Sequence, residues 1–266
     1  MATWRAQVSE LIDSYRQSGA DRGDLMSRLL AARDEEDRGL SDTELADQVA
    51  VLMLAGGETT SAAVTWSWHL LTTHPEILAA VQAETDAVLD GAVAGWDHLP
   101  RLDLTARVVR EALRLYPPAW ALPRVCTRPV TLAGRTLPPG SLVVFSPYIL
   151  HRRPDLYPRP TRFDPARWLT PPPDYRASYL PFGAGATRCI GEEFGLAEST
   201  VILATTAARW TLSPEPGTTV SPAGPSWYPE HSPFTYRPAE VPKTGSLTAE
   251  RISCLPRLGG HNRARA

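Results

Sequence analysis

The stretch YLPFGAGATRCIGEE, residues 179–193, combines one cysteine, one phenylalanine and three glycines just before a helical pattern. Glycines provide the positive φ angles and the close backbone approach that a tight loop around a ligand requires. The segment that follows, from Glu192 to about Trp210, repeats apolar residues at near-helical spacing, namely Phe194, Ala197, Val201 and Ala208. Cys189 therefore lies just before, or at the first turn of, a helix predicted over about 191–210.

The position of Cys189 favours a thiolate over a thiol. The free N–H groups and the positive dipole end at a helix N-terminus stabilise negative charge. A thiolate in an apolar, glycine-lined loop is a ligand for a soft metal or for haem iron. The alternative is that Cys189 is a small buried hydrophobic residue, the usual role of a free cysteine. The flanking residues favour the ligand over this alternative.

The loop 179–191 places four residues at offsets 0, 3, 7 and 9, namely Phe182, Gly185, Cys189 and Gly191. This spacing resembles the haem-thiolate loop of the cytochromes P-450. The resemblance implies haem b as the cofactor, with Cys189 as the axial ligand of the iron. Phe182, Gly185 and Gly191 are then the parts of the loop that hold the macrocycle.

One position of the loop departs from the family's pattern. The family usually has Arg or His two residues before the cysteine, where it bonds a haem propionate, and this chain has Thr187. Arg188, one place later, is one candidate to replace that contact. Arg124 is a second candidate, because an arginine in this segment of the family often meets a propionate. A surface arginine before a strand is the alternative interpretation of Arg124.

Composition limits the class of protein. The chain has 266 residues, 43% hydrophobic and 21% charged, with a formal net charge of −2. This charge gives no case for binding nucleic acid or an anionic membrane surface. Three dispersed cysteines do not indicate a disulfide framework, and no apolar run reaches the ~18 residues of a membrane span. The first residues do not resemble a signal peptide, so we expect a soluble, bacterial-type, cytoplasmic protein.

A long helix is predicted over about 41–73. It opens with a capping box, Ser41 to Glu44, and stops at His74 and Pro75. Its middle is AGGETT, residues 55–60, where two glycines and polar side chains interrupt an apolar helix. A helix kink with solvated polar residues is one interpretation.

The AGGETT stretch also resembles the family's distal helix over the haem. The resemblance implies that Gly56 lets oxygen and substrate approach. It also implies that Glu58 and Thr59 are the catalytic acid and alcohol that deliver protons during oxygen activation.

A second helix is predicted over about 103–116 and carries Glu111 and Arg114, three residues apart. An ordinary surface salt bridge is the simplest interpretation of such a pair. Its position between the glycine-bearing helix and the cysteine loop resembles the family's Glu-x-x-Arg helix. The resemblance implies that Arg167 completes a structural network with Glu111 and Arg114 that fixes the cysteine loop.

The remaining pattern predicts few strands. We expect a hairpin over 131–137, a short buried strand over 142–145, and a strand near 234–236. The predicted fold class is therefore mainly α with small β-sheets (α+β), with an orthogonal-bundle-like helical body. Residues 1–240 resemble a partial cytochrome P-450 domain, the carboxyl-terminal portion of the fold, and residues 241–266, with Cys254, are predicted to be a disordered tail.

The resemblance implies a haem-thiolate monooxygenase, or a fragment of one, that uses dioxygen to hydroxylate or epoxidise a lipophilic small molecule. Electrons come from separate donors of the ferredoxin and ferredoxin reductase type, and the protein is expected to be a monomer. The alternative is a truncated, non-catalytic remnant with weak or no haem binding. A haem-binding sensor that uses the cysteine loop alone is a third hypothesis.

Overall fold

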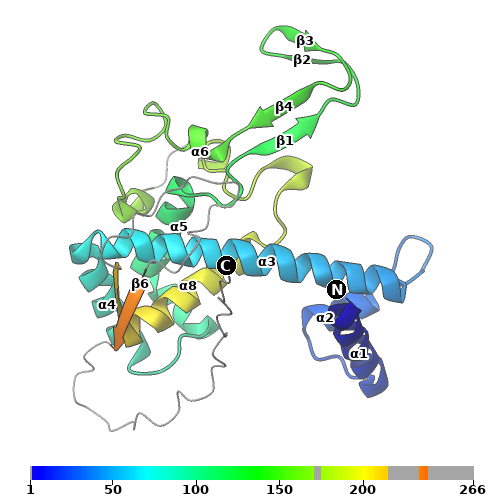
Figure 1. Ribbon diagram of the computed structural model, residues 1–266, viewed down its shortest axis with the longest axis horizontal. Coiled ribbons are helices and arrows are strands. Elements are labelled where there is room, and N and C mark those ends of the chain that lie inside the picture. The colour runs from blue at the N-terminus through cyan, green and yellow to red at the C-terminus, as the bar shows by residue number, and fades with distance from the viewer. Residues whose placement is uncertain (1, 171–174, 215–233, 239–266) are drawn as a thin grey trace, which may run out of the picture.

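The computed structural model describes residues 2–170, 175–214 and 234–238 (Figure 1). The predicted tail 241–266, with Cys254, lies outside the described residues. The helices follow in chain order as α1 (Ala2–Ser18), α2 (Leu25–Ala31), α3 (Asp42–Thr72), α4 (Pro75–Leu89), η1 (Trp96–Arg101), α5 (Asp103–Leu115), α6 (Pro147–Leu150), η2 (Pro165–Leu169), α7 (Tyr175–Ser178), η3 (Gly185–Thr187) and α8 (Glu192–Arg209). The strands are β1 (Leu122–Val125), β2 (Val130–Leu132), β3 (Arg135–Leu137), β4 (Leu142–Phe145), β5 (Trp210–Pro214) and β6 (Phe234–Pro238).

Helix α3 crosses the whole molecule, and α1, α2, α4, α5, α8 and β5 pack against it (Figure 1). Its 31 residues correspond to about 46 Å at 1.5 Å per residue. The capping box forms: the Ser41 hydroxyl accepts the Glu44 N–H at 3.4 Å, and the Glu44 carboxylate accepts the Ser41 N–H at 2.9 Å. The helix ends before His74 and Pro75, as residues before proline avoid the helical conformation. The bounds lie within one residue of the range predicted from the sequence.

The main core lies where the carboxyl-terminal half of α3 meets α4, α5 and α8. Its central side chains are almost fully buried: Trp68, Leu71, Val81, Val108, Ala112 and Leu203. A smaller core joins α1 to the start of α3 through Val8, Ile12, Leu45 and Val49. Between these cores α3 exposes apolar side chains, including Leu54 at 72%.

The strands form two-stranded antiparallel sheets: β1 with β4, β2 with β3, and β5 with β6. The hairpin predicted over 131–137 is confirmed. Its turn residues Ala133 and Gly134 both have positive φ, 49° and 77°, as a two-residue hairpin turn requires.

The burial predicted for the strand over 142–145 is wrong. Leu142 and Val144 of β4 are 64% and 54% exposed, because the β1–β4 ribbon projects from the helical body instead of packing inside it (Figure 1).

The structure confirms the predicted fold class, mainly α with small β-sheets. Among the described helices, none combines the length and the apolar character needed to cross a membrane. Two features of the fold position the candidate site. The cysteine loop leads directly into α8, and α8 packs against α3.

Candidate functional site

The loop 179–191 is folded by its glycines and by its own backbone. Gly183 and Gly185 have φ angles of +72° and +70°, which residues with a side chain rarely adopt. The Cys189 N–H donates to the carbonyl of Phe182 at 2.9 Å and closes the loop. Phe182 packs against the main core and anchors the loop there.

Cys189 itself is exposed, so the alternative of a small buried hydrophobic residue does not describe it. It lies three residues before α8, whose N-cap is Gly191. A Cβ at Gly191 would lie 3.8 Å from the Cys189 Sγ, within ordinary van der Waals contact.

Large apolar side chains next to the cysteine are exposed as well. Ile190 is 93% exposed and Phe194 is 65% exposed. Within the described ranges, no cluster of three or more His, Cys, Asp or Glu side chains could hold a metal ion. Two exposed apolar side chains therefore follow the exposed cysteine closely along the chain.

The two basic candidates beside the loop have different partners. Arg124, on β1, donates from Nη2 to the Thr187 hydroxyl at 2.5 Å and from Nη1 to the Pro123 carbonyl at 2.8 Å. Arg188 donates to the Glu192 carboxylate at 2.7 Å, and this ion pair raises the pKa of the guanidinium. Arg124 therefore reaches the loop at Thr187, whereas the charge of Arg188 is matched on α8.

Helix α3 remains continuous through the AGGETT stretch. A Cβ at Gly56 or Gly57 would meet nothing within 4 Å. Glu58 and Thr59 are exposed. The Thr59 hydroxyl donates to the carbonyl of Ala55 at 2.6 Å, the back-bond that hydroxyl side chains often make in helices.

A hollow of about 340 Å³ lies between α8 and the part of α3 that carries Gly56 and Gly57. Its lining residues are Gly56, Gly57, Thr60, Ser61, Val64, Thr65, Glu198 and Ile202. Across it, the Thr60 hydroxyl donates to the Glu198 carboxylate at 3.2 Å. Neither residue was predicted from the sequence to have a role in the site. The available signal was Glu198, an acid that lies beyond the first turn of α8.

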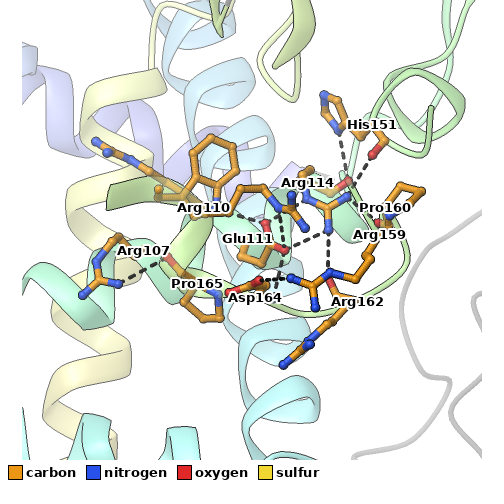
Figure 2. A network of polar contacts seen from close by, with 12 residues as sticks. Arg107, Arg110, Glu111, Arg114, His151, Arg159, Pro160, Arg162, Asp164 and Pro165 are labelled. Atoms are coloured by element: carbon orange, nitrogen blue, oxygen red, sulfur yellow. Dashed lines mark hydrogen bonds and ion pairs between the residues drawn. The ribbon is translucent and has the colours of Figure 1, made fainter. Parts of the chain in front are cut away.

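The Glu111–Arg114 pair is fully buried, with both side chains 0% exposed. Arg114 donates two parallel hydrogen bonds of 2.8 Å to the two carboxylate oxygens of Glu111. Its remaining donors reach backbone carbonyls of His151, Pro160 and Arg162 at 2.9, 2.6 and 3.1 Å (Figure 2). The pair is therefore a buried junction between α5 and the segment 151–162.

Glu111 also accepts hydrogen bonds from the segment 164–168. Its Oε1 accepts the Asp164 N–H at 3.1 Å and its Oε2 accepts the Trp168 Nε1–H at 3.0 Å. Arg167 lies nearby, with its Nε 3.5 Å from Glu111 Oε1, outside hydrogen-bond geometry. The structure thus brings Glu111, Arg114 and Arg167 together. Trp168 and the Asp164 backbone are partners that the sequence pattern did not indicate.

Comparison with known proteins finds a matching family model and similar proteins. A family model described as "Cytochrome P450" matches residues 5–229. Two relatives from Streptomyces melanosporofaciens, cyclooctatin synthase and cyclooctat-9-en-7-ol 5-monooxygenase, are 50% and 46% identical over 81% and 82% of this chain. The matched region is 48% of each relative, so the chain spans about half the length of these curated relatives.

The fold has solved counterparts too. The structure of retinoic acid-bound cyanobacterial CYP120A1 superimposes with a TM-score of 0.80 and 28% sequence identity. The superposition covers 90% of this chain and 56% of the other.

Proposed function

Because the chain belongs to the cytochrome P450 family, we propose that it binds haem b through the Cys189 thiolate and serves a monooxygenase reaction. The reaction uses dioxygen to hydroxylate or epoxidise a lipophilic small molecule, with electrons from donors of the ferredoxin and ferredoxin reductase type. One observation carries the proposal. The glycine loop leaves Cys189 exposed just before α8. Helix α8 in turn lines a hollow together with Gly56 and Gly57 of α3.

The residues present fit a thiolate-ligated haem. A single exposed sulfur matches the one protein ligand that such a haem takes from its proximal side. The exposed side chains of Ile190 and Phe194 offer an apolar surface for a flat macrocycle. When bound, thiolate-ligated haem supplies the activation of dioxygen and favours cleavage of the O–O bond.

Glu58 and Thr59 of α3 move protons in this proposal. The Thr59 hydroxyl keeps its lone pairs after donating to the Ala55 carbonyl. It can therefore accept a proton from the Glu58 side and pass its own onward after rotating away from Ala55. Gly56 and Gly57 have no side chains, so the hollow beside them stays free for oxygen and substrate.

Arg124 supplies the positive charge that the loop lacks at Thr187. Its guanidinium lies on the Thr187 hydroxyl, so a cation stands at the position where the family usually has Arg or His. A carboxylate there, such as a propionate, gains a charge-assisted hydrogen bond. Arg188 is the weaker candidate, since its guanidinium already pairs with Glu192.

The names of the relatives support a proposal for the substrate class. One is named for oxidation of cyclooctat-9-en-7-ol, which supports a terpenoid-type substrate for this chain. The apolar rim of the hollow, with Val64 and Ile202, suits such a molecule.

A second candidate is a haem-binding chain without turnover. It is favoured by the exposure of apolar side chains beside the loop and on α3, with Ile190 at 93% and Leu54 at 72%. A macrocycle held by the sulfur and one face leaves more readily than one enclosed on both faces.

The test is the absorption spectrum of the purified chain with haem, reduced and bound to carbon monoxide. We expect a Soret band at the red-shifted position of a thiolate-ligated haem, which Cys189→Ser abolishes. A band at the histidine-ligated or free-haem position in the unmodified chain would defeat the proposal. A shifted band without product from a lipophilic substrate and an electron donor would favour the second candidate.

A further inference from the structure

His151 is a buried histidine for which the proposed reaction has no role. It follows α6 directly and is 0% exposed. Its ring stacks on Tyr179, with 5.5 Å between centroids and an interplanar angle of 22°, and meets Tyr157 edge-on. Burial lowers its pKa to about 3, so at neutral pH the ring is uncharged and carries one N–H.

The hydrogen bonds of His151 define its tautomer. Nδ1 lies 3.0 Å from the carbonyl oxygen of Arg114, which can only accept, so Nδ1 carries the hydrogen and donates it. Nε2 is then an acceptor, and it takes the backbone N–H of Leu180 at 2.9 Å. Arg114 Nη1 also donates to the His151 carbonyl at 2.9 Å. The histidine is therefore bonded to Arg114 through both its ring and its backbone.

Leu180 stands at the start of the cysteine loop. Its carbonyl accepts the Gly183 N–H at 3.1 Å, and two residues after Leu180 the Phe182 carbonyl accepts the Cys189 N–H at 2.9 Å. A short run of hydrogen bonds and backbone thus connects the His151 ring to the backbone of the cysteine.

We propose that His151 is a positioning residue that ties the start of the cysteine loop to the buried Glu111–Arg114 pair and so sets the direction of the Cys189 sulfur. The inference rests on the proposed function in one respect: haem binding is the reason why the direction of the sulfur matters. The bonds themselves join only groups of this chain. A neutral ring that donates at one nitrogen and accepts at the other suits this task, because both partners are single backbone groups with fixed roles.

Three variants separate the two ring bonds. In His151→Gln the amide oxygen falls near the Nε2 position and keeps the bond to Leu180. In His151→Asn the amide N–H falls near the Nδ1 position and keeps only the bond to Arg114. His151→Phe keeps a ring against Tyr179 and loses both bonds.

The measurement is hydrogen–deuterium exchange of the full, haem-free chain, with peptides over 179–191 compared with α4 as an internal reference. Loss of a partner for a buried donor corresponds to a change of roughly tenfold or more in a local opening equilibrium. We expect the loop to exchange about tenfold faster in His151→Asn and His151→Phe, and near the wild-type rate in His151→Gln. The exchange of α4 should not change in any variant.

Two results would overturn the inference. One is a loop that exchanges at the wild-type rate in His151→Phe, or as fast in His151→Gln as in His151→Phe. The other is an increase in the exchange rate of α4 as large as that of the loop, which would make His151 a general core residue. With haem added, the carbon-monoxide spectrum should keep its red-shifted band in His151→Gln and lose part of it in His151→Asn. Absence of that band from the wild-type chain would count against the proposed function, while the exchange result would still decide the role of His151.

Discussion

Removal of the Arg114 guanidinium tests how much the buried junction stabilises this fold. Arg114→Met keeps a side chain of similar length and deletes every donor. Glu111, 0% exposed, then retains the Trp168 and Asp164 N–H groups, with Arg167 at 3.5 Å. The carbonyls of His151, Pro160 and Arg162 lose the hydrogen bonds that Arg114 donated.

The expected loss of stability is large. Removing one partner of a buried ion pair costs about 3–5 kcal/mol, because the other charge remains buried without its counter-ion. A domain has a total stability of only about 5–15 kcal/mol. With a urea m-value of about 3 kcal/mol/M, the upper end of the usual range, the unfolding midpoint should fall by roughly 1–1.7 M.

The assay is urea unfolding of the haem-free chain, followed by circular dichroism. Arg153→Met is the matched control, because Arg153 pairs with Asp155 at 2.5 Å while both side chains are more than half exposed. The control should leave the midpoint unchanged. The double variant Glu111→Gln/Arg114→Met should lose less free energy of unfolding than the two single variants lose in sum, since the two residues interact directly. An Arg114→Met midpoint close to that of Arg153→Met would refute the reasoning.

Three further predictions follow from the site. Gly57→Ala should stabilise the haem-free chain by about 0.5–1 kcal/mol, because the added Cβ meets open space. Gly185→Ala should destabilise the chain by about 1–2 kcal/mol, because Gly185 has a φ of +70°. The unfolding midpoints of the two variants should therefore shift in opposite directions. The His151 pKa of about 3 lies below the value of 6.5 expected when unfolded, so the unfolded chain binds the extra proton first and stability should fall from pH 6.5 toward 3, by up to about 1.4 kcal/mol per unit. Midpoints at pH 7, 6 and 5 should show a smaller slope in His151→Gln. Thr59→Ala should lower the ratio of product formed to oxygen consumed, and an unchanged ratio would remove Thr59 from the proposed proton path.

Local sequence signals located the long helix α3 and the β2–β3 hairpin. The capping box at Ser41 defines the start of α3 through side-chain-to-backbone hydrogen bonds. Pro75 defines its end by disfavouring the helical conformation of the residue before it. The hairpin turn at Ala133 and Gly134 follows from the same kind of signal. These predictions succeed because each depends on a few residues that are neighbours along the chain.

Burial was less accessible to the sequence. The spacing of Glu111 and Arg114 was most simply interpreted as that of a surface pair, since three residues permit a pair on any face of a helix. Likewise β4 has the apolar run of a buried strand, yet two of its side chains are more than half exposed. Whether a side chain is covered depends on which other elements pack over it, and local pattern does not carry that information.

The sequence by itself determined the helices, the hairpin and a cysteine loop with the spacing of a family that uses a thiolate. Only the tertiary structure decided which side chains meet across long separations: Thr60 with Glu198, Arg124 with Thr187, and His151 with Leu180. The physical reason is the range of the interactions. Helix caps and turns are satisfied within a few residues, whereas these contacts exist only after separate elements have packed and brought their donors and acceptors together.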